Sequence, residues 1–192
     1  MKSLCTSVVA VCLTTAAVQA QDASQWAGAY GGLTYTTGQG EMIYYNPGPN
    51  PFDLDGSGVG AMLGYNFATG PWVFGAELAY STAEIGIATG APGWNFTSMI
   101  DLKARAGYAM NNMLFYGTLG KTVTQWQEGA GSGGNDGDGF LYGVGVDYLV
   151  SPRFFVGAEY LVRDVTSDWN NNPGDYFDAK FNTLTLRVGM KF

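Results

Sequence analysis

One stretch decides the fold class: Phe181-Asn182-Thr183-Leu184-Thr185-Leu186-Arg187-Val188-Gly189-Met190-Lys191-Phe192. Apolar side chains occupy every second position from Leu184 to Phe192, and polar residues and glycine fill the positions between them. This period of two predicts a β-strand with one apolar face and one polar face. Such a strand either leaves a free edge or pairs on both sides. We expect it to meet the first strand in a closed sheet.

The same alternation recurs in seven earlier segments of about ten residues, the length that crosses a bilayer when a strand is tilted. These predicted strands are residues 26–37, 58–67, 72–82, 98–108, 113–125, 140–150 and 154–165. The strand at 113–125 is the least regular, because Lys121 falls on its apolar face. Either the ammonium group reaches the membrane rim along its flexible stem, or a bulge shifts the register.

The connections between these segments alternate strictly between short and long. Tight turns are expected at residues 68–71, 111–112 and 151–153, and long polar loops at 38–57, 83–97, 127–139 and 166–178. A soluble sandwich would mix turn lengths at both ends, whereas outer-membrane barrels have short periplasmic turns and long extracellular loops. The pattern predicts an all-β fold, an eight-stranded antiparallel up-and-down transmembrane β-barrel, and we expect a monomer.

Aromatic residues on the apolar faces form two bands, as at the two interfaces of a membrane. The band near the short turns comprises Tyr65, Phe67, Trp72, Phe74, Tyr108, Tyr148, Phe154 and Phe192, and the band near the long loops comprises Tyr35, Tyr80, Tyr142 and Tyr160. A soluble lipid carrier with eight strands would hold its apolar face inside and its charges outside. Glycine and balanced opposite charges on the polar face argue against that arrangement.

The start of the chain predicts export. Lys2, the apolar run from Val8 to Val18 and small residues up to Ala20 are typical of a secretory signal over residues 1–20, which leaves one barrel domain over 21–192 in the outer membrane. Removal of the signal takes both cysteines and leaves 9 − 1 = 8 basic against 16 acidic residues, a net charge of −8. This balance argues against nucleic acid as a partner. A mean hydropathy near zero does not exclude a membrane barrel, since alternation averages hydropathy away.

The chain resembles the small eight-stranded outer-membrane barrels typified by the membrane domain of OmpA and by OmpX, especially the surface-antigen branch of alphaproteobacteria. The resemblance rests on the signal, the opening Trp26-Ala27-Gly28-Ala29-Tyr30-Gly31-Gly32, the rhythm of eight strands and the terminal Arg187-Val188-Gly189-Met190-Lys191-Phe192. It implies contact with outer-membrane lipid and lipopolysaccharide. It also implies that the barrel assembly machinery reads a C-terminal signal comprising Val188, Met190 and Phe192.

The polar faces carry charges of both signs. An eight-stranded barrel is just wide enough for its own side chains to fill, so inward charges must pair with one another. The predicted salt-bridge network of the lumen comprises Glu77, Asp101, Lys103, Arg105, Asp147, Glu159, Arg163, Arg187 and Lys191. We expect a plug; the alternative is a narrow path for ions that opens when the pairs exchange.

Catalysis is not expected. The chain has no histidine, and without its two cysteines the common triads and imidazole bases are unavailable. Glu77 and Glu159 could act as acid and base, but basic neighbours favour ion pairing. Residues 133–138 weakly match a calcium-binding repeat, and a single copy cannot stack. We therefore expect neither an enzyme nor a bound metal or cofactor.

Aromatic residues in the predicted long loops could contact a host or a ligand. They are Tyr44, Tyr45, Trp94, Trp169, Tyr176 and Phe177. The sequence favours a structural protein that supports the envelope and displays acidic loops. The alternatives are a channel for small solutes and an adhesin or ligand binder that acts through its loops.

Overall fold

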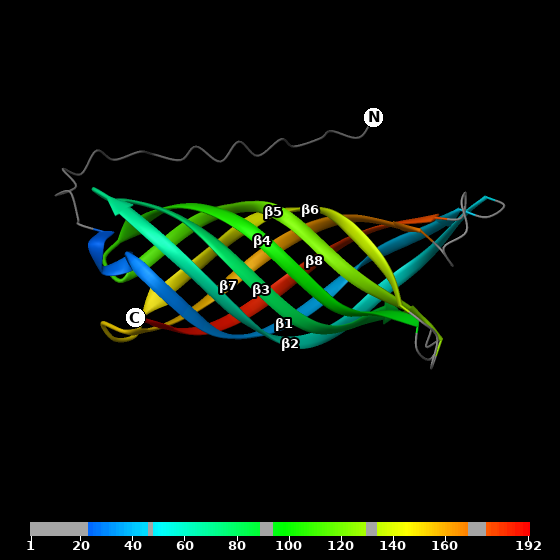
Figure 1. The fold of residues 1–192 in the computed structure, drawn as a ribbon, viewed down its shortest axis with the longest axis horizontal. Coiled ribbons are helices and arrows are strands. Elements are labelled where there is room, and N and C mark those ends of the chain that lie inside the picture. The colour runs from blue at the N-terminus through cyan, green and yellow to red at the C-terminus, as the bar shows by residue number, and fades with distance from the viewer. Residues whose placement is uncertain (1–22, 46–47, 89–93, 130–133, 169–175) are drawn as a thin grey trace, which may run out of the picture.

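A computed structural model of the chain describes residues 23–45, 48–88, 94–129, 134–168 and 176–192. The predicted secretory signal at residues 1–20 lies outside these ranges and stays a prediction. The described part is a single cylinder of tilted strands, with the C-terminus and the short turns at one end and the long connections at the other (Figure 1). We call these the short-turn end and the long-connection end.

The cylinder consists of eight antiparallel strands in sequence order. They are β1 (Gly28–Tyr45), β2 (Pro49–Thr69), β3 (Trp72–Ile87), β4 (Trp94–Met110), β5 (Met113–Glu128), β6 (Gly134–Leu149), β7 (Phe154–Asp168) and β8 (Tyr176–Lys191). β1 also pairs with β8, from Tyr30 opposite Lys191 to Tyr45 opposite Tyr176, so the sheet is closed. The predicted eight-stranded up-and-down barrel, including the contact between its first and last strands, is confirmed.

The strands are tilted, as the stagger of their pairing shows. Partners followed from Tyr30 around the ring return to β1 at Gly40, ten residues further along the strand. Closure of a sheet into a barrel requires such a stagger together with strand tilt. With eight strands the interior has room for side chains and little else.

The strands are much longer than predicted at the long-connection end. β1 and β2 together cover nearly all of the predicted loop at 38–57, and β3 and β4 take up the two ends of the one at 83–97. The predicted loops at 127–139 and 166–178 are likewise strand at both their ends, and the prediction was wrong at these positions. Acidic residues at outward positions, among them Glu41, Asp53, Asp55 and Asp136, alternate with inward apolar ones such as Met42 and Leu54, so the composition was typical of a loop.

The tight turns are where the sequence placed them. Gly70 and Asn111 adopt positive φ values of 55° and 54° in the turns after β2 and β4, and glycine and asparagine are the residues that tolerate this conformation. In the third turn, the Ser151 hydroxyl accepts a hydrogen bond from the backbone N–H of Phe154 at 3.1 Å. These short connections fix the order of neighbouring strands.

A short 3₁₀ helix, η1 (Ala23–Trp26), precedes the barrel. The sequence predicted that the first strand begins at Trp26, but β1 begins at Gly28. Trp26 is instead buried at the short-turn end, where its ring meets that of Phe155 at 6.4 Å between centroids. The Ala23 N–H donates to the Gly70 carbonyl at 3.0 Å, which ties η1 to the turn between β2 and β3.

Apolar side chains point outward around the middle of the barrel. Leu33, Leu63, Leu102 and Leu119 are 60–70% exposed, although they are large and apolar. Lys121 is exposed on the same face, and the pairing of β5 with β6 runs past it without a shift. The bulge predicted as one explanation for Lys121 is therefore wrong. Register shifts occur instead between Ser81 and Ile85 and between Phe96 and Ser98.

Within the described residues, no helix is long and apolar enough to span a membrane.

Candidate functional site

The charged side chains of the barrel lumen converge on Glu77 of β3. Its two carboxylate oxygens lie 2.6 Å from Lys103 Nζ, 3.2 Å from Arg105 Nη1 and 2.5 Å from Arg187 Nη2. The Tyr30 hydroxyl donates to the same carboxylate at 2.8 Å. All four partners are buried, so Glu77 joins β3 to β1, β4 and β8 through the interior.

Two further carboxylates complete the network around the same cations. Asp147 of β6 lies 2.7 Å from Arg105 Nη2 and 3.3 Å from Arg187 Nε. Glu159 of β7 lies 2.6 Å from Lys103 Nζ and 3.7 Å from Arg187 Nη1. Since each cation contacts two or three carboxylates, removal of one group leaves its partners both charged and buried.

A separate ion pair lies nearer the long-connection end. Arg163 Nη2 is 2.5 Å from Asp101 Oδ2, and Arg163 Nη1 donates to the Thr183 hydroxyl. With this pair the lumen contains four carboxylates and four cations, all at most 5% exposed. These eight described charges sum to zero, so the negative net charge of the chain lies elsewhere.

Two buried tyrosines extend the network, and the sequence analysis did not single them out. Arg187 Nη1 donates to the Tyr116 hydroxyl at 3.0 Å, and the Arg105 guanidinium lies 3.8 Å from the centre of the Tyr116 ring. A Cβ at Gly145 would be 2.3 Å from the Tyr116 ring, so only glycine fits opposite it. Tyrosine on the polar face of a strand, opposite a glycine, was the signal available in the sequence.

Lys191 does not join this network. It lies half-buried at the short-turn end, and within the described residues it makes no ion pair shorter than 4 Å. It lines a cavity of about 10 Å³ beside Trp26 and Phe155. Arg105 and Asp147 line the same cavity, so Lys191 faces the lumen. Its predicted place in the ion-pair network was wrong, because it lies four residues beyond Arg187 on β8, toward the short-turn end, and no described carboxylate is within 4 Å of it.

We call the paired charges around Glu77 the ionic layer. Apolar side chains close the lumen on both sides of it. At the long-connection end, ten buried residues pack together: Met42, Leu54, Ile85, Phe96, Met99, Trp126, Val165, Phe177, Ala179 and Phe181. We call this group the upper plug. Its rings are in direct contact, with Phe96 4.9 Å from Trp126 and 5.4 Å from Phe181 between centroids.

A second apolar group, the lower plug, closes the short-turn end. It contains Ala23, Trp26, Tyr30, Met62, Val73, Ala109, Leu114, Tyr116, Leu149 and Phe155. The cavity beside the ionic layer measures about 20 Å³ and the one near the lower plug about 10 Å³. Each is about the size of one water molecule.

The aromatic residues predicted to lie in surface loops belong to strands instead. Tyr44 and Trp94 pack against the upper plug, and Phe177 is fully buried within it. Tyr45 and Tyr176 are paired across β1 and β8, with stacked rings 4.8 Å apart. Their predicted loop position was wrong, because the strands continue past the membrane level. Trp169 lies outside the described residues.

The lumen offers little room for substrate chemistry. Glu77 and Glu159 share Lys103, and the adjoining cavity admits about one water molecule. Among the described residues, no group of three or more metal-ligating side chains is placed to hold an ion.

An outward apolar wall, an inward ionic layer and short turns at one end only together define an outer-membrane β-barrel. The family described as "Outer membrane protein beta-barrel domain" matches residues 8–192, and the chain belongs to this family. It is an outer-membrane protein.

Relatives and solved structures agree with this assignment. The 22 kDa outer membrane protein of Rhizobium leguminosarum bv. viciae is 30% identical over 182 residues, which cover 88% of this chain and 80% of that protein. Ail, the attachment invasion locus protein of Yersinia pestis, has a similar structure at 15% identity, with a TM-score of 0.51 over 86% of this chain and 99% of that one. Neisserial surface protein A gives 17% identity and a TM-score of 0.50, over 86% and 97%. At these identities the two structures show the shared fold alone.

Proposed function

We propose that this protein is a closed, non-conducting structural barrel of the outer membrane, which supports the envelope and carries an acidic extension outside it. The observation that supports the proposal best is the sealed lumen. The two plugs and the ionic layer block the axis at three levels, and the cavities between them are about 20 and 10 Å³.

The alternative is a narrow ion path that opens when lumen pairs exchange. The sharing of Glu77 by three cations favours it, since one cation can leave while two remain. An ion would still have to pass the upper plug, whose rings exclude water. We therefore favour a closed barrel.

Single-channel recording on refolded protein in planar bilayers tests this choice. We expect no steady current from the wild-type protein. Leu54→Ala and Phe96→Ala together thin the upper plug, and Trp26→Ala thins the lower one. We expect brief openings at most from either variant, because the ionic layer remains. A steady porin-sized current through the wild-type barrel would contradict the proposal.

The second part of the proposed role concerns the strand ends that continue beyond the membrane at the long-connection end. We call this part of the barrel the acidic extension. Its outward carboxylates belong to Glu41, Asp53, Asp55, Glu84, Asp136, Asp138 and Asp164, all exposed. We call these residues the acidic belt. Barrels of this class direct their long connections outward from the cell, so the belt lies at the cell surface. Adhesion is a further candidate, which the stacked pair of half-buried Tyr45 and exposed Tyr176 favours. Loss of cell binding on shortening the β1–β2 and β7–β8 connections would support it.

We also propose that the protein acts as a monomer and without enzymatic turnover. Phe192 is 75% exposed and its N–H donates to the Ala29 carbonyl at 3.0 Å, so its ring is available to a partner during insertion. We propose that Val188, Met190 and Phe192 form the C-terminal strand signal for the barrel assembly machinery. Replacement of Phe192 by Ala is then expected to slow assembly in cells while refolding in detergent proceeds normally.

A further inference from the structure

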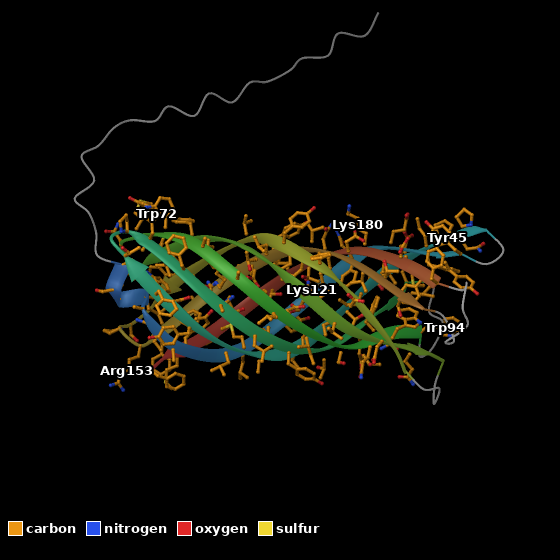
Figure 2. The ribbon with its side chains drawn as sticks, turned by 45° about the horizontal axis from the view of Figure 1, so that its top comes forward. Tyr45, Trp72, Trp94, Lys121, Arg153 and Lys180 are labelled. Carbon is orange, nitrogen blue, oxygen red and sulfur yellow. The ribbon has the colours of Figure 1, made fainter. Side chains whose placement is uncertain are left out.

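Lys121 is a cation on the lipid-facing wall. The outward residues of β5 run Phe115, Gly117, Leu119, Lys121, Val123, so the ammonium group belongs to a row of apolar positions. Val123 is followed by Gln125, so Lys121 lies two outward positions below the first polar residue at the edge of the apolar wall. Figure 2 shows it on the wall between the two ends.

The neighbours of Lys121 supply no anion. Leu102 on β4 and Phe140 on β6 lie directly opposite it, and its Nζ is 5.3 Å from the centre of the Phe140 ring. Among the described residues, no carboxylate lies within 4 Å of this ammonium group. A cation at this depth is costly unless it reaches the interface and finds a counter-charge.

Lys180 on β8 provides an internal comparison. It also points outward, but lies nearer the long-connection end (Figure 2). Its direct partners in the sheet are Glu41 on β1 and Asp164 on β7, so it has a carboxylate on each side. The protein itself therefore provides anions beside Lys180 and none directly beside Lys121.

An apolar groove on the outer wall runs from β3 to β8 and crosses β5 and β6 on the short-turn side of Lys121, with Leu119 between its lining and Lys121. Its volume is about 590 Å³, and Phe115 and Gly117 of β5 and Val144 and Val146 of β6 contribute to its lining. Gly117 leaves the groove open, since a Cβ there would meet only the Gly143 carbonyl, at 3.9 Å. A groove of this kind beneath a cation fits a lipid with an anionic headgroup and a chain that runs down the wall.

We propose that Lys121 and this groove bind one phosphorylated glycolipid of the outer leaflet, with its phosphate on the Lys121 ammonium and an acyl chain along β5 and β6. The outer leaflet is the source because Lys121 lies at the upper edge of the apolar wall, on the side of the long connections. An ammonium–phosphate contact is charge-assisted, and the apolar setting excludes competing water. Binding here does not depend on whether the lumen conducts.

Native mass spectrometry of the refolded protein in detergent, titrated with bis-phosphorylated lipid A, tests the proposal. We expect Lys121→Ala to weaken lipid A binding about fivefold, the effect of one cation at a membrane surface. Lys121→Arg is expected to keep the affinity and Lys180→Ala to leave it unchanged. Dephosphorylated lipid A should bind wild-type protein as weakly as lipid A binds Lys121→Ala.

Two further variants test separately whether the acyl chain contributes to binding and whether the protein's own carboxylates affect it. Gly117→Leu fills the groove, so it should weaken binding of lipid A but not of the phosphorylated disaccharide without its chains. Asp138 lies two positions before Phe140 on β6, toward the long-connection end. Asp138→Asn removes this carboxylate, and we expect the affinity for lipid A to equal or exceed that of the wild type.

Several results would overturn the proposal. They are equal affinity of Lys121→Ala and wild type, an equal loss in Lys180→Ala or Asp138→Asn, and no effect of Gly117→Leu. Equal competition by phosphatidylglycerol would also overturn it, because the site would then accept any anionic lipid. Every substituted side chain points outward, and heat-modifiable migration on unboiled gels verifies that each variant has folded.

Discussion

The barrel has two stacked regions that arrange the same eight strands in opposite ways. Around the middle, Leu33 faces outward at 70% exposure while Glu77 faces inward at 1%. Toward the long-connection end, Phe96 and Phe181 face inward and are fully buried, while Glu41 faces outward and is exposed. The side of the wall that is apolar therefore changes along each strand.

The difference follows from what lies outside the wall. In the membrane region the exterior must be apolar, and an apolar interior would gain little over lipid, so hydrogen bonds and ion pairs can fill the lumen. In the upper region water surrounds the wall, and the hydrophobic effect drives apolar side chains inside, as in a soluble barrel. This relation holds for the ionic layer and the upper plug, whereas the lower plug is apolar inside although the wall beside it, at Phe74 and Phe115, is apolar outside as well.

Charge is divided between the regions in the same way. Among the described residues, the lumen contains four acidic and four basic side chains, and the acidic belt adds seven exposed carboxylates. Lys180 is the only lysine or arginine between belt carboxylates in the described part of the chain. Three predictions, on the ionic lumen, the wall and the upper plug, test the contrast between the two regions, in order of expected effect.

The largest effect is expected from Glu77→Gln in the ionic lumen. It leaves three buried cations without their shared carboxylate, and we expect a loss of about 3–5 kcal/mol in the free energy of unfolding. Urea unfolding in detergent, followed by tryptophan fluorescence, measures it. As a control, replacement of the separate pair by Asp101→Leu with Arg163→Met should be nearly neutral. Wild-type stability in Glu77→Gln would show that the lumen charges do not hold the barrel together.

The wall itself is tested by placing one charge in each region. Leu33→Arg puts a guanidinium against the bilayer and is expected to cost about 2–4 kcal/mol in lipid vesicles. Ser57→Arg puts the same group on the neighbouring strand at the level of water and is expected to change stability by less than about 0.5 kcal/mol. Similar costs at both positions would mean that the boundary between the regions is misplaced.

The smallest effect of the three is expected from Leu54→Ala in the upper plug. Leu54 is 2% exposed, and its truncation is expected to cost about 2 kcal/mol, the low end for a buried leucine, because the strand ends can relax into the space. Limited proteolysis should then cut near the long connections while the membrane region stays heat-modifiable. A loss as large as that of Glu77→Gln would show that the two regions unfold as one.

The sequence predicted the membrane region well. Alternation placed Leu184, Leu186 and Val188 outward and Arg187 inward, and the structure agrees because lipid on one side enforces a strict period of two. The tight turns followed from Gly70 and Asn111, which tolerate positive φ. These features depend on local chemistry, so they could be predicted.

The upper region could not be predicted in the same way, because its polarity is inverted. Asp53 and Asp55 with nearby prolines indicated a loop, yet Leu54 between them is buried in a strand. The sequence of β8 held the relevant signal, since Phe177, Ala179 and Phe181 alternate with Asp178, Lys180 and Asn182. A period of two with the opposite face apolar predicts a strand that has left the membrane.

The sequence by itself determined the class of fold, the number and order of strands, the tight turns and eight of the nine charges expected in the lumen network, because each depends on neighbours along one strand. Only the tertiary structure decided that Glu77 is shared by three cations, that Lys191 stands apart and that the upper plug closes the axis. Those contacts join strands far apart in sequence, and the stagger of the closed sheet sets which side chains meet at one level.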